Sequence, residues 1–248
     1  HGVKLTTAGQ SYAEGCRIVL RAIADLDAVM ADFGSGQRGG LRLACTSSAL
    51  TGRLPELLAR YAAGHPGIDL DIQEMGAAKA LLALDEGRAD IAIVSDNYDF
   101  TRFDIKVFED DRVWVLAPPD HPLADAIEPR KDIAFAAVLD YAFVGIHHAG
   151  SLDRLLADAA KTADKKLTET VRVESFPALV RMVEAGFGIG FLRSTSLHLL
   201  AGTDLVCAPL AEPWALRQLL LARRKSTPLS AAMKNFIALC SETYVPST

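Results

Sequence analysis

The stretch that decides the fold is residues 176–192, FPALVRMVEAGFGIGFL. It predicts a helix over 176–185 and a strand over 188–192, separated by glycines. The run Gly186-Phe187-Gly188-Ile189-Gly190 looks like a phosphate-binding loop, but such a loop follows a strand and precedes a helix. Here the order is reversed, so the glycines are predicted to form a helix C-cap and a tight turn into the strand.

The residues around this stretch continue the alternation of helix and strand. Ahead of it we predict strand 141–146, helix 151–160 and strand 169–174. The same order occurs about a hundred residues earlier, although the residues themselves barely match. Its elements are strand 41–46, helix 53–63, strand 68–74, helix 77–86 and strand 89–94. This alternation implies parallel sheets covered by helices on both faces, so the fold class is α/β with two small doubly wound lobes.

Two further strands are predicted to join the lobes. Residues 112–119 cross from the first lobe to the second, and residues 216–222 cross back, which leaves a closing helix over 230–242 to pack on the first lobe. Two crossings make a hinge. The predicted division is 37–115 with 222–248 for lobe I and 116–221 for lobe II, after an opening segment of 1–36.

That opening segment predicts a long helix. Thr7 and Gln10 have the spacing of a capping box, and the apolar residues that follow alternate four and three apart, which is the seam of a coiled coil. The seam either pairs with a second molecule or packs on the protein's own body. Residues 34–40, GSGQRGG, end the helix and separate it from the lobes, which favours pairing between molecules. The seam comprises Tyr12, Cys16, Val19, Ile23, Leu26, Met30 and Phe33.

Composition excludes several classes of protein. The 248 residues are half hydrophobic and carry a net charge of −5, which predicts a folded chain without a basic surface for nucleic-acid phosphates. No apolar run approaches the roughly 20 residues that span a bilayer, and no secretory signal is expected at His1. Four scattered cysteines fit neither a zinc site nor a disulfide framework, so we expect no cofactor, and a reducing cytoplasm fits best.

Candidate binding residues lie where the predicted parallel strands end. Ligands bind outside the carboxyl ends of such strands, and this rule selects six short segments. They are 46–48, 75–77 and 95–96 in the first lobe, and 146–148, 175–177 and 193–195 in the second. The hydroxyls of Thr46, Ser47 and Ser48 suit a carboxylate or a phenol, although each of them could instead cap the following helix.

The second-lobe segments offer positive charge. His147 and His148 could contact an acidic ligand, and adjacent histidines are a poor metal signal because neighbours in a strand point to opposite faces. Arg193 is either a fixed cation for a carboxylate or half of a salt bridge. Ser175 precedes Phe176-Pro177 and is expected to cap the helix. No enzyme motif is present, and the acidic run Glu109-Asp110-Asp111 is expected to be a solvated face.

Several stretches resemble the LysR-type transcriptional regulators, and the resemblance covers essentially the whole chain. The most specific are Val3-Lys4-Leu5-Thr6-Thr7-Ala8-Gly9 and residues 180–192. The family's other typical stretches are matched by residues 40–43, 54–58, 87–93 and 116–124.

The resemblance implies a periplasmic-binding-protein-like domain of type 2 that binds a small effector between its lobes. It also implies a homodimer or homotetramer, RNA polymerase as a partner, and promoter DNA bound through a winged helix-turn-helix ahead of His1. The helix that carries Arg53 and Leu57 would lie at the dimer interface. Carried over by position, the effector contacts are Thr46, Ser47, Ser48, Ala77, Ser95, Ile146, His147, His148, Ser175 and Phe176, to which the strand-end rule adds Arg193.

Two other classes share the lobe plan. A solute-binding protein of a transporter would need an export signal and no dimerising helix. An enzyme would need an acid or base in the cleft, where His147 and His148 are the candidates. The coiled-coil seam favours the regulator.

Overall fold

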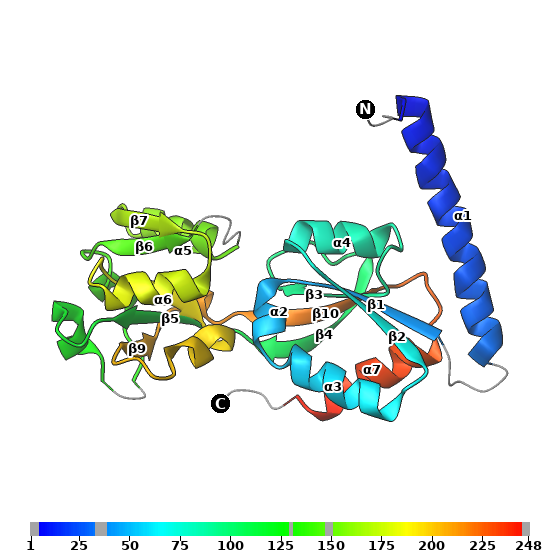
Figure 1. The fold of residues 1–248 in the computed structure, drawn as a ribbon. Coiled ribbons are helices and arrows are strands. Elements are labelled where there is room, and N and C mark those ends of the chain that lie inside the picture. Colours follow the sequence, from blue (N-terminus) through cyan, green and yellow to red (C-terminus); the bar gives the residue numbers. More distant parts are fainter. Residues whose placement is uncertain (1–4, 33–38, 129–130, 147–150, 245–248) are drawn as a thin grey trace.

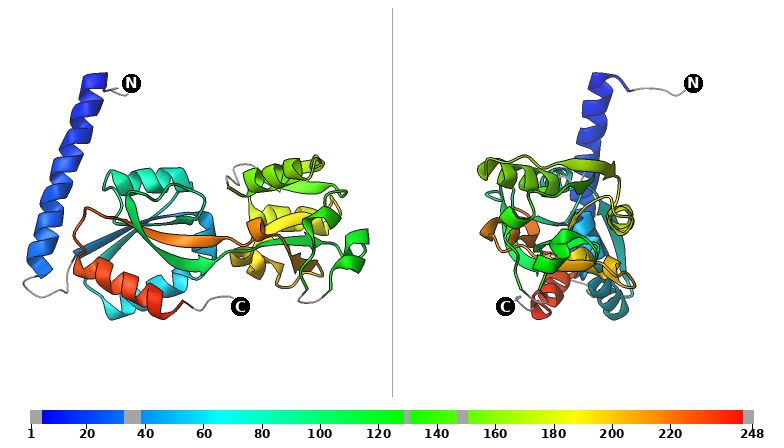
Figure 2. Two further views of the ribbon diagram at one scale, coloured as in Figure 1. Left: turned by 180° about the vertical axis from the view of Figure 1, so that it is seen from behind. Right: turned by 90° about the vertical axis from the view of Figure 1, so that its left-hand side faces the viewer.

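The chain folds into two α/β lobes and one long helix (Figure 1). The computed structural model describes residues 5–32, 39–128, 131–146 and 151–244. Lobe I lies between lobe II and the helix α1 (Thr7–Asp32), and the reverse view in Figure 2 agrees. This is the architecture predicted from the sequence.

Lobe I is built on a five-stranded sheet in the order β2-β1-β3-β10-β4. Its strands are β1 (Gly39–Cys45), β2 (Ile68–Glu74), β3 (Ile91–Ser95), β4 (Phe103–Asp110) and β10 (Gln218–Arg224). Helix α4 (Ala77–Asp85) covers one face, and α3 (Leu54–Gly64) and α7 (Ala231–Glu242) cover the other (Figure 1). Their apolar faces form two core clusters, one on each side of the sheet.

Lobe II repeats this plan with shorter strands. Sheet β8-β5-β9 is joined to the pair β6-β7 by a bridge between Phe143 and Ile189. The strands are β5 (Val113–Ala117), β6 (Phe143–Ile146), β7 (Glu169–Val173), β8 (Gly190–Arg193) and β9 (Val206–Pro209). Helix α5 (Ser151–Thr162) contributes to one core cluster and α6 (Phe176–Glu184) mainly to the other.

The sheets are mixed, whereas the sequence predicted parallel ones. Strands β1, β2 and β3 pair in parallel, as do β6 and β7. In contrast, β10 runs antiparallel to β3 and β4, and β5 runs antiparallel to β8 and β9. The difference has a physical reason: β5 and β10 enter their sheets from the other lobe, so no helical crossover forces them to be parallel.

Two chain segments connect the lobes. Because β5 pairs only with lobe II strands and β10 only with lobe I strands, the connections lie at residues 110–113 and 210–218. The predicted boundaries, 115/116 and 221/222, fall inside β5 and β10 and are therefore several residues late. Division of the chain into independent domains stays a prediction.

Several short elements were not predicted. They are the helix α2 (Ser47–Thr51), the strands β4 and β9, and the 3₁₀ turns η1 (Pro122–Ala126), η2 (Phe135–Ala137), η3 (Ser194–Leu200) and η4 (Pro213–Ala215). Helix α2 and turn η3 matter most, because they contact each other across the two lobes: Thr51 Oγ1 lies 3.5 Å from Ser196 Oγ.

The start of α1 differs by one residue from the predicted capping box. Thr6, not Thr7, caps the helix, since its Oγ1 accepts a hydrogen bond from the Gly9 amide at 3.1 Å. Thr7 is the first residue of the helix itself. The helix therefore begins where the side chain can reach an amide two to three positions inside it.

The glycine turn after α6 forms as predicted. Gly186 and Gly188 have backbone φ angles of +81° and +126°, which residues with a Cβ atom rarely adopt. A Cβ at Gly188 would also collide with the carbonyl oxygen of Ala142. The turn thus brings β8 directly beside β6, and Ile189 donates its amide to Ala142 while its carbonyl accepts from Val144.

Candidate ligand-binding cleft

A cavity of about 680 Å³ lies between the lobes at the ends of their strands. Its walls come from the ends of β1, β2 and β3 in lobe I, and from β8, α5 and α6 in lobe II. The lining residues are Thr46, Ser47, Ser48, Glu74, Met75, Gly76, Ala77, Ala78, Lys79, Ser95, Tyr98, Asp111, Leu152, Phe176, Arg193 and Leu219. Seven of the eleven predicted effector contacts are among them.

The hydroxyls of Thr46 and Ser47, which follow β1, are in different states. Ser47 Oγ donates a hydrogen bond to the carboxylate of Glu74. Thr46 stands at the N-cap position of α2, yet its side chain makes no capping bond. Its Oγ1 is buried without a hydrogen-bond partner in the described part of the chain. A buried hydroxyl without a partner costs free energy, so Thr46 Oγ1 is available to a ligand in the cavity.

Helix α4 points its N-terminus at the same cavity. Ala77 is the first residue of this helix, and the N-cap residue Gly76 provides no side-chain hydrogen bond. The first amides of a helix carry partial positive charge, and Lys79 adds a full charge nearby. Ser95 at the end of β3 is buried and donates to Asn97 Oδ1 at 2.9 Å. The N-terminus of α4 and Lys79 on this side of the cleft can hold an acidic group, while the nearby carboxylate of Glu74 accepts from Ser47.

Lobe II contributes a buried ion pair. Arg193 Nη1 lies 3.4 Å from Asp111 Oδ2, and the two side chains are 4% and 1% exposed. Burial lowers the pKa of Arg193 and raises the pKa of Asp111, and in each case the opposite charge of the partner counteracts the effect. Of the two predicted roles for Arg193, the salt bridge is present, and the guanidinium also lines the cavity.

Two predicted contacts, Ile146 and Ser175, lie elsewhere. Ile146 ends β6 with its side chain buried in the lobe II core, because this position of the strand faces α6. Ser175 Oγ accepts from the Ala178 amide at 3.4 Å, which is the capping role expected of it, and does not line the cavity. His147 and His148 lie outside the described residues.

The structure adds cleft residues that the sequence did not reveal. Glu74, Ala78, Lys79, Tyr98, Leu152 and Leu219 line the cavity, as does Asp111. Asp111 was expected on a solvated acidic face, and this expectation was wrong. It follows β4 directly and accepts a hydrogen bond from Thr195 Oγ1 at 3.0 Å, so the hinge carries it inward. No local sequence signal separates Asp111 from the partly exposed acids beside it.

The proposed oligomerisation residues differ in exposure between α1 and lobe I. On α1, the seam residues Val19, Ile23, Leu26 and Met30 are between 52% and 60% exposed. The opposite side of α1 faces lobe I, where Arg21 donates to the Glu86 carbonyl at 3.3 Å and Asp25 lies 3.5 Å from Arg42. The seam is therefore turned away from the protein's own body, while Phe33 lies outside the described residues.

The two predicted interface residues at α3, Arg53 and Leu57, do not present a free surface. Leu57 is 3% exposed and packs in the lobe I core with Tyr61 and Phe236, so its predicted role was wrong. Arg53 donates to the Cys240 carbonyl at 2.9 Å, and its guanidinium lies 4.6 Å from the Phe108 ring centroid. The interface role was implied by the family resemblance, which concerned the whole helix and did not separate its inner face from its outer one.

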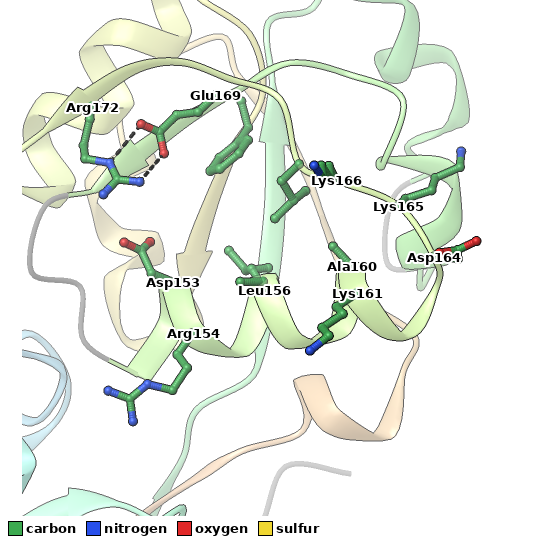
Figure 3. A pocket seen from close by; sticks show the side chains of 13 residues that line it. Asp153, Arg154, Leu156, Ala160, Lys161, Asp164, Lys165, Lys166, Glu169 and Arg172 are labelled. Carbon is green, nitrogen blue, oxygen red and sulfur yellow. Dashed lines mark hydrogen bonds and ion pairs between the residues drawn. The ribbon is translucent and has the colours of Figure 1, made fainter.

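A second hollow of about 720 Å³ lies on lobe II between α5 and β7 (Figure 3). Phe143 and Leu156 are apolar residues of its lining. Arg172 pairs with Glu169 through two hydrogen bonds of 2.8 and 2.6 Å. Lys161 and Lys166 lie on its rim. None of the predicted effector contacts borders this hollow, and only one lobe forms it.

Other kinds of site receive no support within the described ranges. No group of three or more His, Cys, Asp or Glu side chains is placed to hold a metal ion there. None of the described helices is long and apolar enough to cross a membrane. The cysteines are free: Cys45 and Cys240 are buried, and Cys16 and Cys207 are partly exposed.

These features define a two-lobed ligand-binding module preceded by an exposed helix. A family model described as the LysR substrate binding domain matches residues 34–244, and the chain belongs to this family. It is the effector-sensing region of a LysR-type transcriptional regulator, as predicted from its sequence. The match does not favour the alternative of a transporter's solute-binding protein.

Relatives with similar sequences are transcriptional regulators. The HTH-type regulator YbhD of Escherichia coli K12 is 26% identical over 239 residues, covering 96% of this chain and 74% of that protein. The HTH-type activator CmpR of Synechocystis PCC 6803 is 25% identical over 244 residues, covering 95% of this chain and 76% of that protein. The chain thus spans about three quarters of their length.

Solved structures share the fold. Full-length BenM matches with a TM-score of 0.74 at 19% identity, covering 98% of this chain and 79% of that one. The regulatory domain of Synechocystis PCC6803 CcmR, solved in complex with 2-PG, matches with a TM-score of 0.72 at 22% identity, covering 83% and 98%. These matches confirm the predicted fold class, the type 2 periplasmic-binding-protein-like fold.

Proposed function

We propose that the cleft binds a small organic acid as the effector of this regulator. The observation that carries the proposal is the cavity of about 680 Å³, to which lobe I contributes hydroxyls and charged side chains and lobe II contributes Arg193. The acidic group would contact the N-terminus of α4, Lys79 and the unpaired hydroxyl of Thr46. The ligands named with related domains are compatible with this class, since 2-PG is bound to CcmR, benzoate to BenM and shikimate to QuiR.

The lobes would transmit binding by changing their relative orientation. Only two chain segments connect the lobes, and α2 contacts η3 directly across them, so a ligand that bridges the cleft adds contacts that favour closure. Lobe I also touches α1 through Arg21 and Asp25. A change at the cleft can therefore reach the helix that we propose as the dimerising element.

The partners are those of the family. We propose that α1 pairs with a second copy, in a homodimer or homotetramer, and that a winged helix-turn-helix of the full-length protein contacts promoter DNA. RNA polymerase is the proposed partner in transcription and the cytoplasm the proposed location. We further propose that the chain performs no catalysis, because its relatives are transcriptional regulators.

A ligand screen tests the proposal. The thermal unfolding temperature of the 1–248 chain should rise in the presence of some small organic acids, because a ligand that binds only the folded state stabilises that state. Titration calorimetry on Ser48→Ala should show weaker binding of any acid that is found, by about 1–3 kcal/mol. The matched control is Ser241→Ala, a serine on α7 outside the cleft, which should leave the affinity unchanged. Equal affinities in the wild type and Ser48→Ala would move the site away from the β1 end.

A further inference from the structure

The floor of the cleft carries two opposite charges, and both are already buried. Asp111 and Arg193 line the cavity, with side chains only 1% and 4% exposed. The Asp111 amide donates to the Arg217 carbonyl at 2.7 Å, and Asp111 Oδ1 accepts from Thr195 Oγ1 at 3.0 Å. These bonds hold the carboxylate in place at the hinge.

The ion pair leaves capacity for a third polar atom. Asp111 Oδ2 lies 3.4 Å from Arg193 Nη1, whereas a tight charge-assisted hydrogen bond measures about 2.7–2.9 Å. A carboxylate offers about four acceptor positions, and among the described residues Asp111 uses them for Thr195 and for this long contact to Arg193. A ligand atom between the two groups could therefore accept from the guanidinium and donate to the carboxylate.

Charge decides which ligand atom fits there. A ligand carboxylate would meet the Asp111 carboxylate in a buried site, and an ammonium would meet the Arg193 guanidinium. A ligand acid that displaced Asp111 from Arg193 would leave Asp111 as a buried charge without its cation, which is strongly unfavourable. A hydroxyl avoids both conflicts, because the same oxygen donates one hydrogen bond and accepts others.

The acidic end of the ligand has a separate place. The N-terminus of α4 and Lys79 lie on the lobe I side of the cavity, whereas Asp111 and Arg193 lie at the hinge and on lobe II. We infer that Asp111, paired with Arg193, is a specificity-determining residue that selects a hydroxyl, so that the effector is a hydroxylated carboxylic acid. This inference rests on the proposed function of the cleft as an effector site.

Matched pairs of acids test the inference. Mandelate and phenylacetate, glycerate and propionate, and salicylate and benzoate differ within each pair by hydroxyl groups. Calorimetry on the 1–248 chain should show that the hydroxylated acid of at least one pair binds about tenfold more tightly, because its analogue leaves the Asp111–Arg193 pair without the third polar atom. In Asp111→Asn the ratio of the two affinities, hydroxylated acid to unhydroxylated acid, should fall close to one for that pair.

Asp104→Asn is the matched control. Asp104 is a lobe I carboxylate on β4 that pairs with Arg223 and does not line the cavity, so its amide variant should keep the tenfold ratio of affinities. Circular dichroism and thermal unfolding report whether each variant is folded. If Asp111→Asn does not fold, a crystal structure of the wild type with the tightest hydroxy acid decides: the hydroxyl should lie within hydrogen-bond distance of Asp111 Oδ2.

The other outcomes overturn the inference. Equal or tighter binding of the unhydroxylated acids in every pair would contradict it, and so would a ratio that Asp111→Asn does not change. In both cases the proposed function survives, because acids still bind and Ser48→Ala still weakens them. Failure of all six acids to bind also rejects the inference as stated, and the wider thermal screen then decides separately whether the cleft binds organic acids at all.

Discussion

The hydroxyl of Ser47 donates a hydrogen bond to the carboxylate of Glu74, which ties the start of α2 to the end of β2 at the cleft. The adjacent hydroxyl of Thr46 is buried and has no such partner in the described chain. Two neighbouring side chains that the sequence could not distinguish thus have different roles: Ser47 serves the fold, and Thr46 is available to a ligand.

Thr46→Val should therefore weaken effector binding while leaving the fold intact. Valine keeps the shape of threonine but removes the unpaired oxygen, so the free energy of unfolding should stay the same or rise slightly. Binding of an effector acid should weaken by about 1–3 kcal/mol. Urea unfolding and titration calorimetry measure the two quantities. A variant that loses stability but keeps its affinity would show that the hydroxyl serves the fold.

Leu26→Glu should disrupt self-association through α1. Leu26 is 60% exposed on the face directed away from lobe I, so a charge there interferes with a partner helix and not with the protein's own core. Analytical ultracentrifugation should show a smaller species than the wild type at the same concentration. Ala24→Glu adds the same charge outside the seam and should leave assembly unchanged. Equal masses for Leu26→Glu and the wild type would assign assembly to another surface.

Substitutions at the two glycines after α6 should differ in cost. At Gly186 a Cβ meets nothing within 4 Å, so Gly186→Ala pays only for the positive φ, about 1 kcal/mol. At Gly188 the Cβ also collides with the Ala142 carbonyl, so Gly188→Ala should cost about 3 kcal/mol or more. Urea unfolding of both variants gives the comparison. Equal losses would mean that the β6–β8 contact relaxes around the new methyl group.

Leu57→Ala should behave as a core substitution. Its side chain is 3% exposed among lobe I core residues, so its truncation should reduce the free energy of unfolding by about 2–5 kcal/mol. Glu56→Ala, on the exposed side of the same helix, should cost less than about 0.5 kcal/mol. Thermal unfolding monitored by circular dichroism tests both. If Leu57→Ala lost the dimer but kept the free energy of unfolding of the wild type, Leu57 would be assigned to the interface instead of the core.

Alkaline pH should destabilise the folded chain through its buried thiols. Burial raises the pKa of Cys45 from 9.0 to about 11. Because the thiol ionises more easily in the unfolded chain, this contribution to stability is complete below about pH 9 and is lost as the pH rises through about 11. Urea unfolding between these pH values should show that the free energy of unfolding declines as the pH rises. The decline should be shallower in Cys45→Ala than in the wild type. Parallel declines in both proteins would assign the effect to other groups.

The sequence by itself determined the order of elements and most of the candidate site. The spacing of apolar residues and the positions of glycines predicted β2 at its observed bounds. They predicted most other elements to within a few residues, because these signals act between neighbours in the chain. The rule that ligands bind at strand ends then brought Thr46, Ser48, Ala77 and Arg193 to one cavity. The coiled-coil seam likewise required only local spacing.

Only the tertiary structure decided which side chains are buried and with which partners. Leu57 faces the core and Asp111 faces the cleft because α7 and the hinge pack over them, and those segments are distant in sequence. The antiparallel entry of β5 and β10 similarly depends on how the second lobe returns to the first. Burial and ion pairing arise from contacts across the fold, which local periodicity does not contain.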